Sequence, residues 1–439
     1  MELESAELRA PVTSYAEPMG PPRSSRLMLR TLRIGLILAA LAVVTWKQYE
    51  LDRFFVPKEL VLHVTALCVG LLALRAFRRL PFTRVDVLLA IFLLLSALSA
   101  IFATNGWLAL RALAVSASGI VTFWAARSLR QNELGWPLLV TLAITVVVVA
   151  ITSLLQTYGV STDFFSINRS PGGTLGNRNF VAHMAAFGMP VVLYVALTAR
   201  KHSAFFTGLL GATLVAAVLV LTRSRAGWLA AGAALGVIVT CFVISPALRR
   251  YRRALIRFSI LVVVAVAGVG AAVTMPNALR WNTDNPYLES IRGVANFQEG
   301  SGRGRLVQYR QSLRMAIGSP LLGVGPGNWA VEYPDYAARQ DPSLDNSEPG
   351  TTSNPWPSSD WIAYVSERGP IATLALAFAL LGIIISALRR LRTATDGDDA
   401  LAAAAAIATI AAAIVAGMFD AVLLLALPAM FVWAALGAL

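Results

Sequence analysis

The sequence predicts an all-α polytopic membrane protein with about twelve transmembrane helices and one long, partly helical extracytoplasmic loop. Two observations predict this fold class. Of the 439 residues, 57% are hydrophobic and only 14% are charged, and the mean hydropathy is +0.65, whereas soluble domains are about 45–50% apolar and about 25% charged. The apolar residues also form runs long enough to cross the hydrocarbon layer, which takes about 20 residues per helix. An ordinary soluble enzyme is therefore excluded.

Twelve apolar segments follow one another along the chain. The first is the weakest, because only Ile34–Trp46 is free of charge, so a tilted or interfacial helix is an alternative there. Residues 1–30 are expected to form a disordered cytoplasmic tail, since the first 22 lack the apolar run of a signal peptide. The expected segments are 31–47, 59–77, 85–104, 107–126, 134–156, 179–198, 204–222, 226–246 and 258–275 within residues 31–275, and 370–388, 400–418 and 421–438 within residues 370–439.

The net charge of +13 lies in the connections between these segments. Basic residues precede the first segment and follow the second, fourth, sixth, eighth and tenth, so every second connection is basic. Such connections face the cytoplasm, and an even number of spans then places both termini there. Nucleic-acid-binding proteins instead gather their basic residues on one soluble face. We therefore expect a lipid bilayer and no nucleic acid as partner.

The longest outer connection, residues 276–369, is too long to be a simple linker. Within it, the spacing of apolar residues predicts an amphipathic helix over 305–317 that ends at Gly318. A rigid Gly/Pro turn, 320–329 (PLLGVGPGNW), follows it. The predicted apolar face consists of Leu306, Tyr309, Leu313, Ala316 and Ile317, and the other face carries Arg310 and Arg314.

The chain has no metal-binding or phosphate-loop motif, and both of its cysteines lie in apolar runs, so neither a metal, a cofactor nor ATP-driven pumping is expected. What remains is arginine in the outer connections. Arginine binds phosphate oxygens in bidentate fashion, and a helix N-terminus adds N–H donors, so this pattern suits a lipid-linked diphosphate. Arginines that only contact lipid headgroups are the alternative. The candidate residues are Arg178, Arg223, Arg225, Arg303 and Arg305.

Four segments of the chain resemble the O-antigen ligase and O-antigen polymerase family, in the family's order. The most specific is the third, in which an arginine-opened helix is followed by PLLGVGPGNW. The segments are 173–180 (GTLGNRNF), 222–229 (TRSRAGWL), 302–329 (GRGRLVQYRQSLRMAIGSPLLGVGPGNW) and 358–369 (SSDWIAYVSERG).

The resemblance implies a glycosyltransferase at the periplasmic face of the bacterial inner membrane. In this family the donor is an undecaprenyl-diphosphate-linked glycan, and the acceptor is lipid A-core or another glycan. An acceptor hydroxyl attacks the anomeric carbon with inversion and without a metal, and the lipid diphosphate leaves. The resemblance makes Arg225 and Arg305 the residues that hold the diphosphate.

The chain departs from the family at the expected catalytic base. Ligases of this family carry a His-Asn pair about ten residues before Glu-x-Gly, whereas here Ser358 and Ser359 occupy those positions. Asp360 is the expected base if burial raises its pKa, with Glu367 second and His183 third. A flippase or transporter of a lipid-linked or anionic saccharide, and an inactive scaffold of a glycan-assembly complex, remain as alternative functions.

Overall fold

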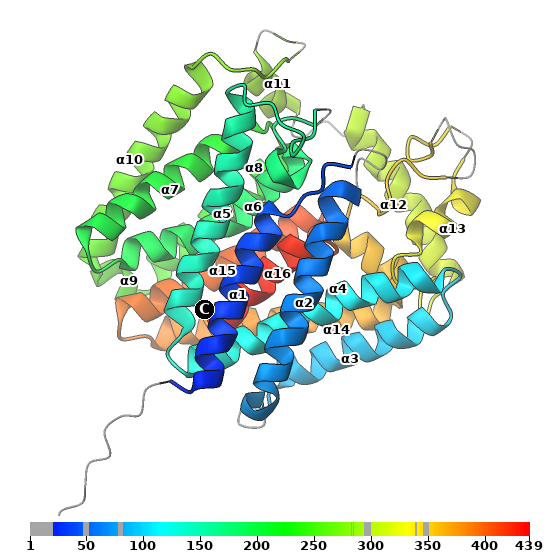
Figure 1. Cartoon of the computed structure of the whole chain (residues 1–439), viewed down its shortest axis with the longest axis horizontal. Coiled ribbons are helices and arrows are strands. Elements are labelled where there is room, and N and C mark those ends of the chain that lie inside the picture. The colour runs from blue at the N-terminus through cyan, green and yellow to red at the C-terminus, as the bar shows by residue number, and fades with distance from the viewer. Residues whose placement is uncertain are drawn as a thin grey trace, which may run out of the picture.

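The computed structural model describes residues 21–46, 52–77, 82–167, 169–281, 283, 285–293, 300–338, 340–345 and 351–439. Within these ranges the chain forms sixteen α-helices, one short 3-10 helix and no β-strand, which confirms the all-α class (Figure 1). The helices are α1 (Arg23–Leu41), α2 (Asp52–Phe77), α3 (Arg84–Ile101), α4 (Gly106–Gln131), α5 (Gly135–Thr157), η1 (Gly173–Leu175), α6 (Arg178–Thr198), α7 (His202–Leu221), α8 (Arg225–Ile244), α9 (Pro246–Arg250), α10 (Arg252–Thr274), α11 (Pro286–Arg292), α12 (Gly300–Gly318), α13 (Trp329–Tyr336), α14 (Asp360–Thr393), α15 (Gly397–Gly417) and α16 (Ala426–Ala438).

Within the described part of the chain, ten helices are long and apolar enough to cross a membrane, namely α2 to α8, α10, α14 and α15. They account for ten of the twelve expected segments and confirm a polytopic membrane protein. The first and last expected segments are not among these ten helices, and the packing of each explains how its bounds differ from the expected ones.

The first helix begins at Arg23, within the stretch 1–30 that was expected to be disordered; residues 1–20 lie outside the described part. It ends at Leu41, short of the expected end at residue 47. Its exposed arginines lie on one face, while Met28, Leu32 and Leu36 on the other face are fully buried. Because this apolar face packs on α2 and α5, the helix extends back through the charged residues.

The last expected segment, 421–438, is helical only in α16, whose 13 residues measure about 20 Å. Residues 421–425 are not helical, because the carboxylate of Asp360 accepts hydrogen bonds from the backbone N–H groups of Val422 (2.9 Å) and Leu423 (2.8 Å). The chain then ends beside Arg390, which donates to the carbonyl of Leu439. Residues 421–439 therefore extend from Asp360, at the start of α14, to Arg390, near its end.

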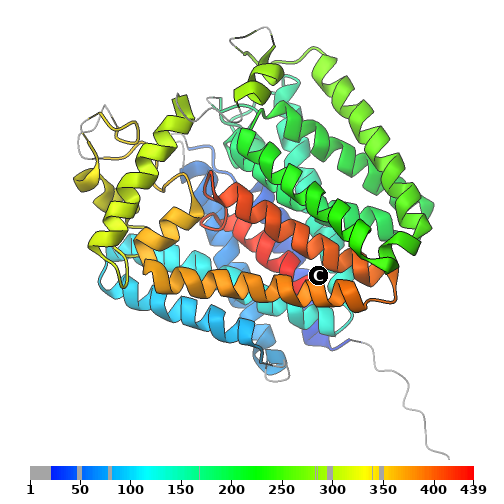
Figure 2. The same cartoon turned by 180° about the vertical axis from the view of Figure 1, so that it is seen from behind.

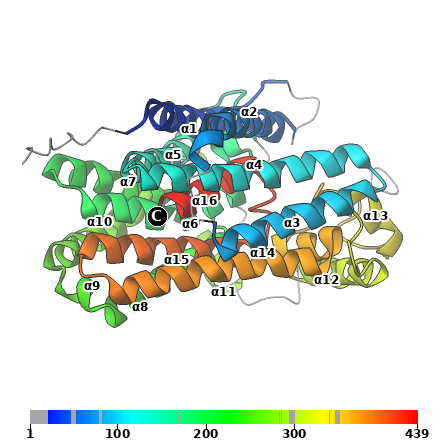
Figure 3. The same cartoon turned by 90° about the horizontal axis from the view of Figure 1, so that it is seen from below.

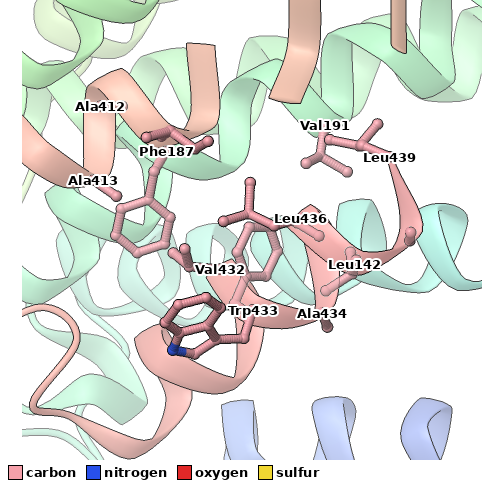
Figure 4. Close-up of a cluster of buried hydrophobic side chains, with 14 of the residues drawn as sticks. Leu142, Phe187, Val191, Ala412, Ala413, Val432, Trp433, Ala434, Leu436 and Leu439 are labelled. Carbon is pink, nitrogen blue, oxygen red and sulfur yellow. The ribbon is translucent and has the colours of Figure 1, made fainter. Parts of the chain in front are cut away.

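The bundle has α1 and α2 on one side and α14 and α15 on the other, with α16 between them (Figure 3). Apolar side chains of α6, α15 and α16 fill the centre, among them Phe187 of α6, Ala413 of α15 and Val432 of α16 (Figure 4). The ring of Phe187 lies 5.8 Å from that of Phe431, measured between centroids. Small residues allow this close approach. A Cβ added to Gly119 of α4 would lie 2.7 Å from the ring of Trp433.

Helix α12 differs from its prediction in both length and buried face. It spans Gly300–Gly318, so it begins five residues before the expected 305, and it ends where expected. The predicted apolar face is largely exposed, with Leu306 52%, Leu313 44% and Ile317 77% exposed, although Ala316 is buried. The protein-facing side instead buries Gln308 and Ser312, whose polar groups bind Ser343 (3.0 Å) and Trp329 (2.8 Å). Polar groups that are paired by hydrogen bonds can be buried at little cost in free energy. Hydrophobic periodicity therefore does not identify a buried face of this kind.

Candidate functional site

The Gly/Pro turn after α12 packs backbone to backbone against a break in α14. Gly369 has φ 79° and ψ 164°, a conformation open essentially to glycine alone, and it separates Asp360–Arg368 from the rest of α14. A Cβ on Gly369 would lie 2.3 Å from the carbonyl oxygen of Leu321, and one on Gly323 would lie 2.4 Å from the carbonyl carbon of Glu367. These glycines of the third and fourth family-like segments therefore serve close packing.

Glu367 secures the same turn. Its carboxylate accepts hydrogen bonds from the backbone N–H groups of Gly327 (2.8 Å) and Trp329 (3.3 Å), and the side chain is 2% exposed. Arg368 beside it is fully buried, with its guanidinium over the rings of Phe92 (5.2 Å) and Tyr364 (4.9 Å). Both charged groups thus have structural contacts, and neither lines the pocket described below.

A second turn, the GTLGN sequence before α6, is held by a buried lysine. The ammonium group of Lys58 donates to the carbonyls of Thr174 (2.8 Å) and Ala42 (2.5 Å). Gly176 follows with φ 72°. The side chain of Asn177 then accepts from the N–H of Asn179 (3.0 Å) and so caps α6, which begins at Arg178. This turn places two asparagines and Phe180 in the lining of a polar pocket.

That pocket has a volume of about 150 Å³ and gathers residues from four separate segments. Arg305 reaches it from α12, and Asp420 from the turn between α15 and α16. Trp356 packs edge-to-face on Phe55, with ring centroids 5.0 Å apart. Amide, hydroxyl, carboxylate and guanidinium groups beside aromatic rings suit a phosphorylated saccharide. The lining residues are Arg169, Asn177, Asn179, Phe180, Arg305, Asn354, Trp356, Ser358 and Asp420.

Tyr309 joins two walls of this pocket. Burial raises the pKa of its phenol to about 12, so the hydroxyl stays protonated. It lies 2.8 Å from the carbonyl of Ser358 and 2.5 Å from that of Met418, and it can donate to either. The segment that carries Ser358 is thereby fixed beside the turn that carries Asp420.

The structure brings together some of the predicted arginines. Arg305 donates through Nε to the carbonyl of Phe419 (3.0 Å), directly before Asp420. Arg225, at the first turn of α8, donates to the carbonyl of Gly293 and is close enough to Arg305 for the two charges to repel each other. Two neighbouring guanidinium groups of this kind can together bind a dianion.

The other predicted arginines lie in different surroundings. Arg223 donates to Ser290 (2.9 Å) and pairs with Glu289 (3.3 Å), which ties it to α11. Both Arg223 and Arg178 lie over the ring of Trp281, at 4.6 and 5.1 Å from its centroid. Arg303 is exposed on α12 and does not line the pocket.

The predicted base, Asp360, does not line the pocket. It is fully buried, and its two carboxylate oxygens accept the N–H groups of residues 422–424 described above. Among the residues that the structure describes, the acid that lines the pocket is Asp420, which none of the sequence motifs singled out. It is half-buried, and Asn179 donates to it at 3.4 Å. A single acidic residue between two apolar segments on the outer side was the available signal.

Replacing Asp360 by Asn is expected to destabilise the fold. The amide presents an NH₂ group to backbone donors, so the loss should be about 2 kcal/mol. Thermal unfolding of the detergent-solubilised protein measures it. A variant of wild-type stability that has lost transfer activity would instead support the sequence-based assignment of Asp360 as the base.

His183 lies near Asp420 and Arg305 within the protein interior. It is 1% exposed, and neither of its ring nitrogens has a hydrogen-bond partner among the described residues. It does not line the pocket. The described residues also include no group of three or more His, Cys, Asp or Glu side chains placed to hold a metal ion.

Comparison with known proteins supports the resemblance found in the sequence. Residues 210–377 match the family model described as O-antigen ligase. The match runs from α7 into α14 and includes Arg225, Arg305 and the glycine-rich turn. The GTLGN turn and Asp420 lie outside it. No curated protein matches the sequence.

Proposed function

We propose that this chain, whose residues 210–377 belong to the O-antigen ligase family, transfers a glycan from a lipid-linked diphosphate donor to an acceptor hydroxyl in the polar pocket. The observation that carries the proposal is the convergence of Arg305, Asp420 and Ser358 on one pocket, with Arg225 beside Arg305. This pocket therefore combines groups that can bind a diphosphate, groups that can hydrogen-bond a saccharide, and a carboxylate that can accept a proton.

The donor in this proposal is an undecaprenyl-diphosphate-linked glycan, whose diphosphate binds Arg305 and Arg225. The guanidinium fork matches two phosphate oxygens and keeps its charge when it is partly desolvated. As the bond from the anomeric carbon to the phosphate oxygen breaks, negative charge grows on the leaving diphosphate. Arginines at that position stabilise the transition state more than the ground state, and the reaction then needs no metal.

The proton acceptor in this proposal is Asp420, in place of the expected Asp360 and Glu367. The acceptor hydroxyl oxygen forms the new bond to the anomeric carbon from the face opposite the diphosphate, so the configuration inverts. Its proton passes to the Asp420 carboxylate. Ser358 and the asparagines of the pocket hydrogen-bond sugar hydroxyls, and Trp356 offers a ring face to a pyranose. Lipid A-core and a further glycan both fit as acceptors.

The sidedness of the proposed site follows from the charge pattern. Residues of the three connections 157–178, 276–369 and 419–420, all expected outside the cytoplasm, meet in the pocket. At the other end, Arg253 donates to the carbonyls of Ala199 and Arg200, which joins two basic connections. In this proposal the basic end faces the cytoplasm, as the positive-inside rule favours. The pocket then lies at the opposite face, which is periplasmic in the bacterial inner membrane that the family resemblance implies.

Replacing Asp420 by Asn tests this assignment. Loss of a general base should lower the transfer rate by about 10²-fold or more, while donor binding is retained. Transfer of radiolabelled glycan and donor binding are both measured on the purified protein. Asp335→Asn, an exposed acid on α13, is the matched control. Wild-type transfer by the Asp420→Asn variant would refute this role.

A further inference from the structure

Helix α12 carries two parallel exposed stripes, one apolar and one basic. Leu306, Leu313 and Ile317 form the apolar stripe, and Leu321 in the following turn continues it at 70% exposure. Arg303, Arg310 and Arg314, all exposed, form the basic stripe. Each arginine precedes a member of the apolar stripe by three residues, so the two stripes lie about 60° apart around the helix.

The stripes have a defined order around α12. The side that carries Gln308, Ser312 and Ala316 is buried against the protein. By helical geometry the apolar stripe comes next around the helix and the basic stripe follows it. Three large apolar side chains beside three cations form the pattern of a helix that lies in the plane of a membrane surface.

The position of α12 fits such a surface. Tyr309 contacts the carbonyl of Met418, one residue past the end of the membrane-spanning helix α15, and Arg305 binds the carbonyl of Phe419. The helix therefore lies at the depth where a spanning helix leaves the hydrocarbon layer. Figure 2 shows α12 running across the end of α14, at a steep angle to it. A helix that crosses the end of a spanning helix lies closer to the membrane plane than to its normal.

We propose that α12 is an interfacial helix that binds the surface of an anionic phospholipid bilayer. Its apolar stripe enters the boundary between headgroups and acyl chains, and Arg303, Arg310 and Arg314 bind lipid phosphates. This interaction holds α12 at the lipid surface whether or not the pocket transfers glycans, so it goes beyond the proposed function.

A quenching experiment on the full chain tests the proposal. Cys68 and Cys241 are replaced by Ser, and a fluorophore is attached to Ile317→Cys, or to Asp335→Cys on α13 as the control. The protein is placed in vesicles of phosphatidylglycerol and phosphatidylcholine in equal parts. Nitroxide-labelled lipid should quench the fluorophore at position 317 several-fold more than the one at 335, and aqueous iodide should show the reverse order.

The basic stripe is tested in the same vesicles. The double variant Arg310→Gln/Arg314→Gln should lose much of the lipid quenching at position 317, and the charge-matched control Arg249→Gln/Arg250→Gln at the other end of the bundle should not. In pure phosphatidylcholine the two double variants should be alike. Strong iodide quenching at position 317 would show that this face of α12 is exposed to water. Protection from both quenchers would show that another protein surface covers it. Either result would overturn the proposal.

Discussion

Replacing Arg305 by Ala is expected to lower the rate of glycan transfer by about 10²-fold or more. The guanidinium lines the pocket, and its fixed position beside Phe419 costs no reorganisation as charge develops on the leaving diphosphate. Removing one such preorganised donor typically costs 10²–10³-fold. Arg305→Lys should restore only part of the rate, because lysine lacks the planar fork. Arg225→Ala should show a similar loss, since the two arginines act on one diphosphate.

The control for this prediction lies on the same helix. Arg310 is exposed and does not line the pocket, so Arg310→Ala in detergent should transfer at the wild-type rate. Initial rates are measured with a labelled donor at saturating concentration. Full activity of Arg305→Ala, or a strict requirement for Mg²⁺ shown by loss of transfer in a chelator, would contradict the proposal that arginine charge stabilises the leaving group.

Gly369→Ala is the second change for which a large effect is expected, in this case on stability. The residue has φ 79° and ψ 164°, and its new methyl group would lie 2.3 Å from the carbonyl oxygen of Leu321. Backbone strain and the clash together should cost about 3 kcal/mol or more. Because backbone surrounds the site, neither neighbour can move away without disturbing α14 or the turn after α12.

Gly232→Ala provides the matched comparison, since nothing lies within 4 Å of the Cβ it would add. Alanine favours the helix by about 1 kcal/mol over glycine at such a position. In thermal unfolding, Gly232→Ala should therefore equal or exceed the wild type, whereas Gly369→Ala should unfold well below it. Equal stability of the two variants would mean that the break in α14 is not required.

The spanning helices could be predicted from sequence because the bilayer imposes the same requirement on each of them. Every span must be apolar and must satisfy its own backbone hydrogen bonds, so its hydropathy alone identifies it. The two ends of the chain could not, because their form depends on particular partners. The segment before α16 is non-helical because Asp360, more than sixty residues away, binds its amides. The start of α1 depends on the surfaces of α2 and α5.

The buried face of α12 shows a second limit of sequence reasoning. Periodicity marks apolar stripes, and it found one at Leu306, Leu313 and Ile317, but that stripe is exposed. The face that meets the protein includes two buried polar side chains, Gln308 and Ser312, which are paired by Ser343 and Trp329. In a membrane protein an apolar stripe has two destinations, the protein core and the lipid, and periodicity does not distinguish them.

The candidate site could be predicted in part. Arg305 and Ser358 line the pocket, and Arg225 lies beside Arg305, because the motifs that carry them converge on one end of the bundle. The roles of the two acids could not be read from their motif. Asp360 and Glu367 bind backbone amides, and Asp420, which belongs to none of the four family-like segments, reaches the pocket instead.

The most direct test of the proposed function follows the label of an undecaprenyl-diphosphate-linked glycan in vesicles that contain the purified protein and a candidate acceptor. We predict that label moves to the acceptor, that undecaprenyl diphosphate is released in equal amount, and that neither occurs with Arg305→Ala. Donor that crosses the bilayer intact would identify a flippase. Donor that binds and stays uncleaved with every acceptor, lipid A-core and glycan alike, would identify a scaffold, and either result would contradict a glycosyltransferase.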